Sequence, residues 1–558
     1  MTTLLLAQDT YTPSTEAVAG SVGWTALVAV LPLAGFFLFL MGFKWAAHTS
    51  AIASVGVALI IAVLPFGMPW DMAGMSLLQG ICFGLFPIVY IIWMAVWIYD
   101  LTVKSGRFED MRVIFSKIGK GDMRIQAMII GFAFGGMLEA LAGFGAPVAI
   151  VSSMLVAIGM KPMKAIVVTL VANAAPVAFG AMAIPVTTGA SLAGLDVSDL
   201  ASQAGRLVGL TAFITPFLLL LIMDGKRGLR QGWPMALVLG ISFGGGQFLA
   251  SNYFAYELTD VVASLVSLVA GIAFLAVWTP TTPEDQASQA DTSGSVLTAQ
   301  RGFLALFPYI LIVVVFAITK LWRIGVDIPA ALASTDIKFG WPGLYERLLT
   351  PAGEPSTSPI FNFNWLSSPG TILFFCGVIT VLVYTFINEN GRYSLGIGTG
   401  FAELFIGLNR MRMSYVTIAA VMGLAYVMNF SGQTAAIGAL LAGTGAIFPL
   451  ISPVLGWLGT FITGSGTSSN ALFAQMQATT AATIGVPEHV LVAANTGGAT
   501  LGKMISPQTV ALGAATVGLV GKESEIMKQT MKVSLGLLVF LGIVVFLQTT
   551  PILGWMVV

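Results

Sequence analysis

Two segments of the chain carry the same pattern of asparagine, glycine and proline inside stretches that are otherwise apolar enough to lie in lipid. In both copies, an asparagine is followed after 7, 9 and 12 residues by glycine, methionine and proline. The positions are Asn173, Gly180, Met182 and Pro185 in the first copy, and Asn495, Gly502, Met504 and Pro507 in the second. A glycine-rich cluster precedes each copy, at residues 143–147 and 464–470. The matching spacings indicate an internal repeat.

The apolar setting of these clusters limits what they can form. Backbone within a bilayer must satisfy its own hydrogen bonds, so residues that break helices persist there only where protein or a water-filled cavity surrounds them. Corresponding breaks in two halves of a chain point to the binding site of a secondary transporter. The alternative is that small residues allow close helix packing. We prefer packing for isolated pairs such as Gly131 and Gly135, and binding for the duplicated cluster.

The composition identifies a membrane protein. Hydrophobic residues make up 57% of the chain and charged residues 9%, against about 25% charged residues in soluble domains, and the mean hydropathy is +0.91. We therefore expect an all-α polytopic membrane protein in contact with the lipid bilayer. The formal net charge is zero and no basic tract is present, which excludes nucleic acid as a partner. Cys82 and Cys376 lie in apolar runs and indicate no disulfide framework.

Apolar runs of about 20 residues, the length that spans a bilayer, set the expected topology. They lie at 24–43, 50–68, 77–99, 206–223, 234–251, 259–278, 302–322, 371–388, 413–431 and 533–550. The short segment 104–124 contains six lysine and arginine residues, so it should face the cytoplasm. Residues 1–23 are then an exposed N-terminal tail on the outer side.

The repeat divides the chain into two transmembrane halves. The first half, 24–278, contains a hairpin at 127–159 and a broken helix at 165–189. A polar cytoplasmic linker, 279–301, leads to the second half, 302–558, with a hairpin at 449–485 and a broken helix at 489–515. Lysines follow the first hairpin but not the second, which indicates opposite orientations. We expect about 12–14 membrane elements in two inverted repeats, each with a broken helix and a re-entrant hairpin.

Several other kinds of chemistry find no support in the sequence. Residues 497–503 nearly match a phosphate-binding loop, but Met504 stands where a serine or threonine would hold magnesium, and no strand precedes the motif. The two histidines, His48 and His489, are expected on opposite sides of the membrane, which argues against a haem. No catalytic triad or metal-ligand pattern is visible. We predict no enzymatic activity, no cofactor and no metal.

Several short runs resemble one family. They are Gly-Phe-Gly-Ala-Pro at 143–147, Gly-Ser-Gly-Thr-Ser-Ser-Asn at 464–470, Ala-Asn-Thr-Gly-Gly at 494–498 and Gly-Lys-Met-Ile-Ser-Pro-Gln at 502–508. They closely resemble the bacterial L-lactate permease family, which includes glycolate permeases, and the resemblance extends from about residue 24 to 550. It implies a symporter of the bacterial inner membrane that takes up L-lactate, and often D-lactate and glycolate, with protons. An anion channel or another carboxylate transporter are the alternatives.

We expect the substrate to bind between the two repeats, where polar and flexible residues lie at matched depth. Exposed N–H groups and the positive ends of half helices suit a monocarboxylate, and hydroxyl groups can bond the substrate hydroxyl. Asn173 and Asn495 would cap broken helices or bond the solute, unless they are structural asparagines with satisfied hydrogen bonds. The predicted substrate-binding residues are Gly143, Phe144, Gly145, Ala146, Asn173, Ser465, Gly466, Thr467, Ser468, Ser469, Asn470, Asn495, Thr496, Gly497, Gly498 and Lys503.

Two charged residues stand alone in apolar surroundings. Glu139 aligns with Thr460 in the other repeat, and Lys503 aligns with Ala181, so each half contributes one charge. An ionisable side chain at depth in a membrane is expensive and is by default a functional candidate. We expect Lys503 to attract the substrate carboxylate and Glu139 to carry the coupled proton. A structural ion pair is the alternative.

Overall fold

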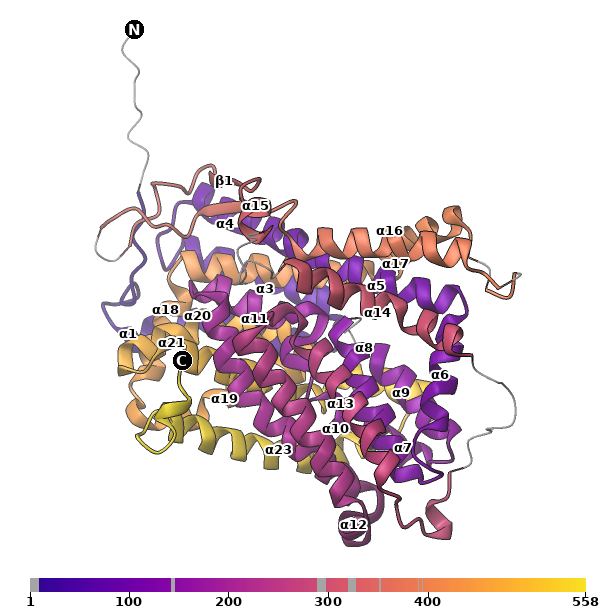
Figure 1. The fold of residues 1–558 in the computed structure, drawn as a ribbon. Helices are drawn as coiled ribbons and strands as arrows, with labels where there is room; N and C mark the ends of the chain where they lie inside the picture. Colours follow the sequence, from indigo (N-terminus) through magenta and orange to yellow (C-terminus); the bar gives the residue numbers. More distant parts are fainter. Residues whose placement is uncertain are drawn as a thin grey trace.

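The computed structural model describes residues 10–141, 146–288, 298–319, 328–350, 353–389, 391–393 and 395–558. Within these residues the chain is almost entirely helical (Figure 1), and the two strands found there, β1 (Ile337–Gly340) and β2 (Ile360–Phe363), form one antiparallel pair. The all-α class expected from the apolar runs is therefore confirmed.

The helices up to residue 286, which lies in the first part of the polar linker, contain the first copy of the repeat. They are α1 (Val22–Ala29), α2 (Leu31–Phe37), η1 (Leu38–Gly42), α3 (Ala47–Val63), α4 (Trp70–Phe83), η2 (Gly84–Val89), α5 (Tyr90–Lys104), α6 (Arg107–Lys117), α7 (Met123–Met128), η3 (Ile129–Phe134), α8 (Gly135–Leu141), α9 (Ala146–Ala157), α10 (Pro162–Asn173), η4 (Val177–Phe179), α11 (Gly180–Ala193), α12 (Val197–Tyr253), η5 (Tyr256–Leu258), α13 (Thr259–Val277) and η6 (Glu284–Gln286).

The helices that follow the linker contain the second copy. They are α14 (Ala299–Thr319), α15 (Ile328–Ala333), α16 (Pro369–Phe386), α17 (Ile397–Phe430), α18 (Gln433–Ala442), η8 (Gly445–Ile447), α19 (Phe448–Thr463), α20 (Gly466–Ile484), α21 (Glu488–Lys503), α22 (Pro507–Thr516), α23 (Glu523–Gln548) and η9 (Gly554–Met556).

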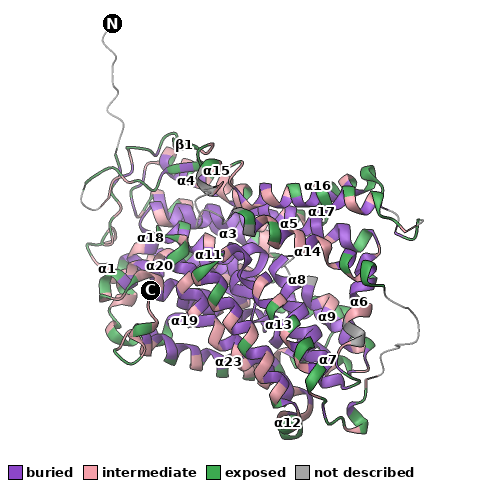
Figure 2. Cartoon of the chain, viewed as in Figure 1, coloured by how far each residue is buried: buried purple, intermediate pink, exposed green. Residues whose placement is uncertain are grey.

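The structure has the surface of a membrane protein. In the described part of the chain, ten helical segments are long and apolar enough to cross a bilayer, or eleven if α10 and η4–α11, bent by 60°, form one broken span. Large apolar side chains such as Leu64, Val277 and Phe386 are more than two-thirds exposed. Soluble proteins rarely expose apolar surface so widely. Buried positions gather in the middle of the bundle, around α8 and α11 (Figure 2).

The long helix α12 is a helical hairpin rather than one rod. Asp224 and Gly225 leave helical geometry, and Gly225 has φ of 60°, so the expected spans 206–223 and 234–251 are its two arms. Glycines let the arms pack closely. A Cβ added at Gly240 or Gly244 would lie 2.5 Å from the carbonyl oxygen of Phe213 or Gly209.

The start of the linker is held against the loop that precedes α7. Arg124 Nη2 donates to the Thr281 carbonyl at 3.0 Å, and Thr282 Oγ1 donates to Asp122 Oδ2 at 3.1 Å. Farther along, Asp285 Oδ2 accepts a hydrogen bond from Arg227 Nη2 at 2.6 Å, which lowers the pKa of that carboxyl below its ordinary value. The linker is therefore attached to the first half before it continues to α14.

The N-terminal tail and the segment before α16 are also attached to each other. The Tyr11 hydroxyl donates to the carbonyls of Phe66 and Ser431 at 3.2 and 2.9 Å, and Tyr11 is buried. Its backbone bonds to Arg347 and Leu349. The tail thus crosses the ends of α3 and α17.

Each copy of the repeat forms a helical hairpin followed by a broken helix. Hairpin 1 consists of α7, η3 and α8 with α9, and its tip, 142–145, lies outside the described residues. Hairpin 2 consists of α19 and α20, and Gly464 at its tip has φ of 71°, a conformation that glycine adopts at little cost. The broken helices are α10–α11 and α21–α22. That the two copies have inverted orientations stays a prediction.

Candidate functional site

The two isolated charges meet in the middle of the molecule. Lys503, the last residue of α21, donates through Nζ to Glu139 Oε1 on α8. Asn173, the last residue of α10, donates from Nδ2 to Glu139 Oε2 at 3.1 Å. The side chains of Lys503 and Glu139 are only 6% and 3% exposed. The structure thus brings together three predicted residues from both copies of the repeat.

A small cavity of about 30 Å³ adjoins this ion pair. That volume holds roughly one or two water molecules, so a hydroxy acid requires the site to widen. The cavity is lined by Glu139, Val177, Gly180, Ala181, Pro185, Gly464, Ser465, Gly466, Thr467 and Lys503. Hairpin 2 and the two broken helices therefore share one site.

At the tip of hairpin 2, the N-terminal end of α20 faces the cavity. Gly464 ends α19, and Ser465 caps α20, its Oγ accepting from the backbone N–H of Ser468 at 3.3 Å. Gly466 and Thr467 are the first residues of α20 and line the cavity. N–H groups in the first turn of a helix have no intrahelical acceptor and carry a partial positive charge. Together with Lys503, they make this wall suitable for a carboxylate.

The opposite wall contains an unusual backbone conformation. Ala181, Met182 and Ala183, at the start of α11, have φ of 46°, 61° and 62°. A left-handed conformation costs about 1–2 kcal/mol for each residue that is not glycine. The surrounding structure must hold this turn in place, and backbone strain of this kind clusters at functional sites.

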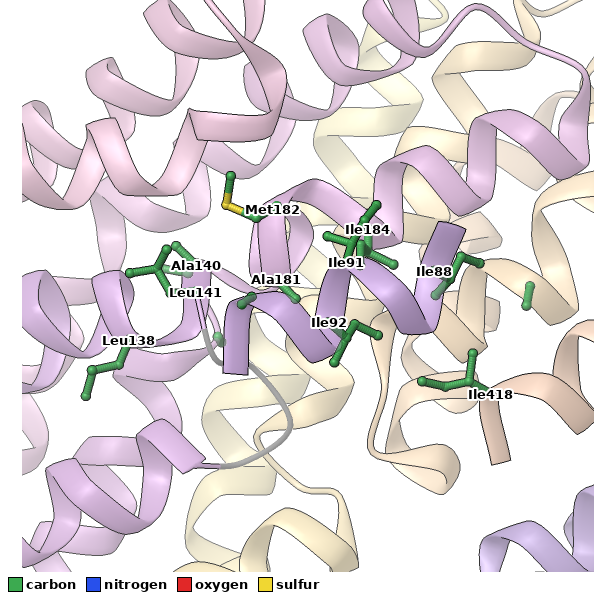
Figure 3. Packing of buried hydrophobic residues seen from close by; sticks show 14 of the residues in the cluster. Ile88, Ile91, Ile92, Leu138, Ala140, Leu141, Ala181, Met182, Ile184 and Ile418 are labelled. Carbon is green, nitrogen blue, oxygen red and sulfur yellow. The ribbon is translucent and has the colours of Figure 1, made fainter. Parts of the chain in front are cut away.

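Apolar packing supplies that support. Figure 3 shows Ala181 with Leu141 of α8 on one side and Ile91 and Ile92 of α5 on the other. All four residues are buried and belong to one hydrophobic cluster. The left-handed turn thus packs between α8 and α5.

The predicted asparagines of the second repeat lie behind the cavity, in a buried polar network. Asn495 Nδ2 donates to Asn470 Oδ1 at 2.8 Å, and Asn470 Nδ2 donates to the Pro185 carbonyl at 2.6 Å and to Thr496 Oγ1 at 2.9 Å. Gln477, which the sequence analysis did not identify, donates to Asn495 Oδ1 at 3.4 Å. Asn495 lies within α21 and caps no break. The network ties hairpin 2 to α11.

The remaining predicted residues have other surroundings. A Cβ added at Gly498 would overlap the Pro453 carbonyl, and Ser469 Oγ donates to the Gly456 carbonyl at 2.8 Å, so both residues pack against α19. Gly497 lies against Leu541. Ser468 lines a neighbouring cavity. Gly143, Phe144 and Gly145 lie outside the described residues, and Ala146 is described only as the first residue of α9.

The neighbouring cavity lies on the other side of the hairpin 2 tip. It has a volume of about 120 Å³ and shares Gly464 and Ser465 with the central cavity. Its remaining lining residues are Ala47, Ser414, Thr417, Ile418, Thr463, Ser468, Gln508, Thr509 and Leu512. Only the tip residues therefore belong to both spaces.

Comparisons with known proteins agree on one family. The family model described as L-lactate permease matches residues 25–552. The glycolate permease GlcA of Escherichia coli strain K12 is 39% identical over 96% of this chain and 98% of its own length. The L-lactate permease of the same strain is 38% identical over 99% of this chain and all of its own length. The L-lactate permease of Bacillus subtilis strain 168 is 36% identical over 98% and 99% of the two chains.

Among solved structures, the chain is similar to the YdaH transporter of Alcanivorax borkumensis. The TM-score is 0.42 and the identity 16%, with 86% of each chain covered. This similarity is too low to support an argument about the present site.

Proposed function

The chain belongs to the L-lactate permease family, and we propose that it is a secondary transporter for L-lactate and related 2-hydroxy monocarboxylates such as D-lactate and glycolate. In this proposal it takes up its substrate with protons, without altering it chemically, across the bacterial plasma membrane. The observation that carries the proposal is the buried pair of Lys503 and Glu139 beside the start of α20.

The ion pair gives a physical reason for coupling. In the empty site, Glu139 neutralises Lys503. A substrate carboxylate that binds Lys503 and the first N–H groups of α20 brings a second negative charge to one cation. Two carboxylates in a poorly solvated site cannot both stay ionised at low cost. Glu139 therefore takes up one proton as the substrate replaces it, and the loaded site is again neutral.

Asn173 is suited to both states of Glu139. It now donates to the carboxylate through Nδ2, and its Oδ1 has no hydrogen-bond partner in the described part of the chain. An amide can donate to a carboxylate or accept from a protonated carboxyl after turning about its terminal bond. Asn173 would thus keep Glu139 in place after Lys503 has turned to the substrate.

The cavities support a carrier with alternating access. An outer cavity of about 690 Å³ is lined by residues that include Ser191, Asn429 and Gln475, and under the positive-inside rule we expect it on the external side. Under the same rule we expect the 120 Å³ cavity on the cytoplasmic side. We propose that the hairpin 2 tip, residues 463–466, is the gate between this cavity and the central site. A channel would instead need a continuous polar path.

Transport by the purified protein in liposomes tests the proposal. With labelled L-lactate outside, an acidic exterior should drive accumulation, and an excess of unlabelled lactate inside should drive counterflow. Glycolate and D-lactate should compete. Flux without counterflow would identify a channel. Lactate transport that does not respond to a proton gradient would contradict the coupling.

A further inference from the structure

Asp260 is a buried carboxyl group without a cationic partner. It lies in the first turn of α13 and is fully buried. Gln247 Nε2 on α12 donates to Asp260 Oδ1 at 2.7 Å, and the backbone N–H of Phe179 also contacts the carboxyl group. Oδ2 has no hydrogen-bond partner, and Asp260 forms no ion pair, among the residues that the structure describes.

These surroundings favour the neutral form of Asp260. A buried carboxylate with no cation loses its hydration without compensation, and such groups usually bind a proton instead. The N-terminal end of α13 supplies only a partial positive charge. A protonated carboxyl group, in contrast, carries no net charge, and it can still accept hydrogen bonds from Gln247 and from the backbone N–H of Phe179.

Asp260 and Glu139 lie on two helices, α13 and α8, that pack against each other. A Cβ added at Gly136 on α8 would lie 2.8 Å from Ser264 Oγ on α13. Glu139 lies three residues after Gly136, and Asp260 lies four residues before Ser264. Each carboxyl group is therefore about one turn from this contact, on the face of its own helix that makes the contact. Glu139 is near enough to act electrostatically on Asp260. Ser264 Oγ has no partner in the described residues.

The break between α10 and α11 lies between the two carboxyl groups. Gln247 Nε2, besides bonding Asp260, donates to the Ala175 carbonyl at 3.1 Å. Gly180, at the other end of the break, lies against Glu139, since an added Cβ would be 3.2 Å from Oε1. The other titratable groups next to Asp260 are Tyr256 and Glu257 of η5, which interact with each other. The segment that lines the substrate cavity thus touches both carboxyl groups.

We propose that Asp260 is a second proton-binding residue of the transport cycle. This proposal rests on the proposed proton-coupled transport and adds a second proton-binding site to it. In the empty protein Asp260 holds a proton while Glu139 is ionised against Lys503. When the substrate carboxylate replaces Glu139, the O–H bond of Asp260 breaks and an O–H bond forms on Glu139, which releases this proton on the cytoplasmic side when the substrate leaves. Asp260 then takes one proton from the external side, so one proton enters with each monocarboxylate.

The variant Asp260→Asn tests this role, because an amide keeps the shape of a neutral carboxyl and can still accept from Gln247. Ser267→Ala is the matched control on the same helix, since within the described part of the chain Ser267 Oγ bonds only to the Leu239 carbonyl at 3.2 Å. In liposomes, Asp260→Asn should retain lactate counterflow, while accumulation driven by a proton gradient should fall about a hundredfold. A positioned proton-transfer group typically contributes a rate factor of at least about this size. The control should behave as the wild type.

Infrared spectroscopy gives a readout that does not depend on transport. Wild-type protein with isotope-labelled aspartate should show the C=O band of a protonated aspartate at neutral pH, and the band should persist in Glu139→Gln and vanish in Asp260→Asn. Absence of the band in the wild type would overturn the proposal even if the variant does not fold. Unchanged proton-driven accumulation in Asp260→Asn would overturn it too, as would sodium dependence that this variant removes. Wild-type protein that shows the band but never accumulates lactate would instead contradict the proposed function.

Discussion

Replacing Lys503 with methionine should separate the stabilising role of the ion pair from its role in binding. Methionine keeps much of the side-chain volume and removes the charge, which leaves Glu139 buried with Asn173 as its remaining donor. Removing one partner of a buried pair costs about 3–5 kcal/mol. A lost hydrogen bond from a charged donor to the substrate is worth about 1.5–3 kcal/mol, so lactate should bind about ten to a hundred times more weakly.

The double variant Glu139→Gln, Lys503→Met is the decisive control. Replacing both members of a buried pair with neutral residues of similar size is often neutral for stability. Thermal unfolding in detergent should therefore show a lower Tm for Lys503→Met and recovery in the double variant. Lactate binding should stay about ten to a hundred times weaker in both variants, and uptake should stay impaired.

If the double variant concentrates lactate at the wild-type rate, the pair is structural and the carboxylate site lies elsewhere. Wild-type affinity in Lys503→Met alone would also contradict the binding role of Lys503, because no other described lysine or arginine lines the central cavity.

Three further predictions concern the same site. Glu139→Gln should exchange lactate but lose accumulation driven by a proton gradient; a full gradient with unchanged proton movement would contradict this role. In a background without Cys82 and Cys376, Ser468→Cys should react with an impermeant thiol reagent from the cytoplasmic side, because Ser468 lines the 120 Å³ cavity. Ser469→Cys should not react, because Ser469 is fully buried and does not line that cavity; labelling from outside only would reverse the assigned gate. Gly498→Ala should reduce the yield of folded protein on size-exclusion chromatography, because its Cβ would overlap the Pro453 carbonyl, whereas Gly536→Ala, with open space around it, should not; equal yields would show that the helices can separate.

Proline and glycine act locally, so helix breaks can be expected near them. In the structure α10 ends at Asn173, three residues before Pro176, and α22 begins at Pro507, because a proline cannot continue a preceding helix. The two charges were also recognisable, since an isolated ionisable residue in an apolar run has few roles other than function or pairing. The structure adds that they pair with each other.

Other parts of the site depend on which helices face each other, and no local pattern shows that. The left-handed turn at Ala181–Ala183 contains no glycine, so turn chemistry gives no signal. Gly498 looked like a binding residue but fills the contact with α19. Asp260 lies in the first turn of an apolar helix, where acidic residues are common. Only its burial against α8 and the broken helix distinguishes it.

The charges that the two repeats do not share set the stoichiometry of the proposed cycle. Thr460 stands where the first repeat has Glu139, and Ala181 stands where the second has Lys503. If each repeat had both a glutamate and a lysine at these positions, the central site would hold two ion pairs and could bind two anions. With one lysine, each substrate carboxylate must displace one glutamate, and the buried site stays neutral only if one proton arrives with it. In the proposed cycle, Asp260 is protonated whenever Glu139 is paired with Lys503. The loss of symmetry between the repeats therefore predicts one proton for each monocarboxylate.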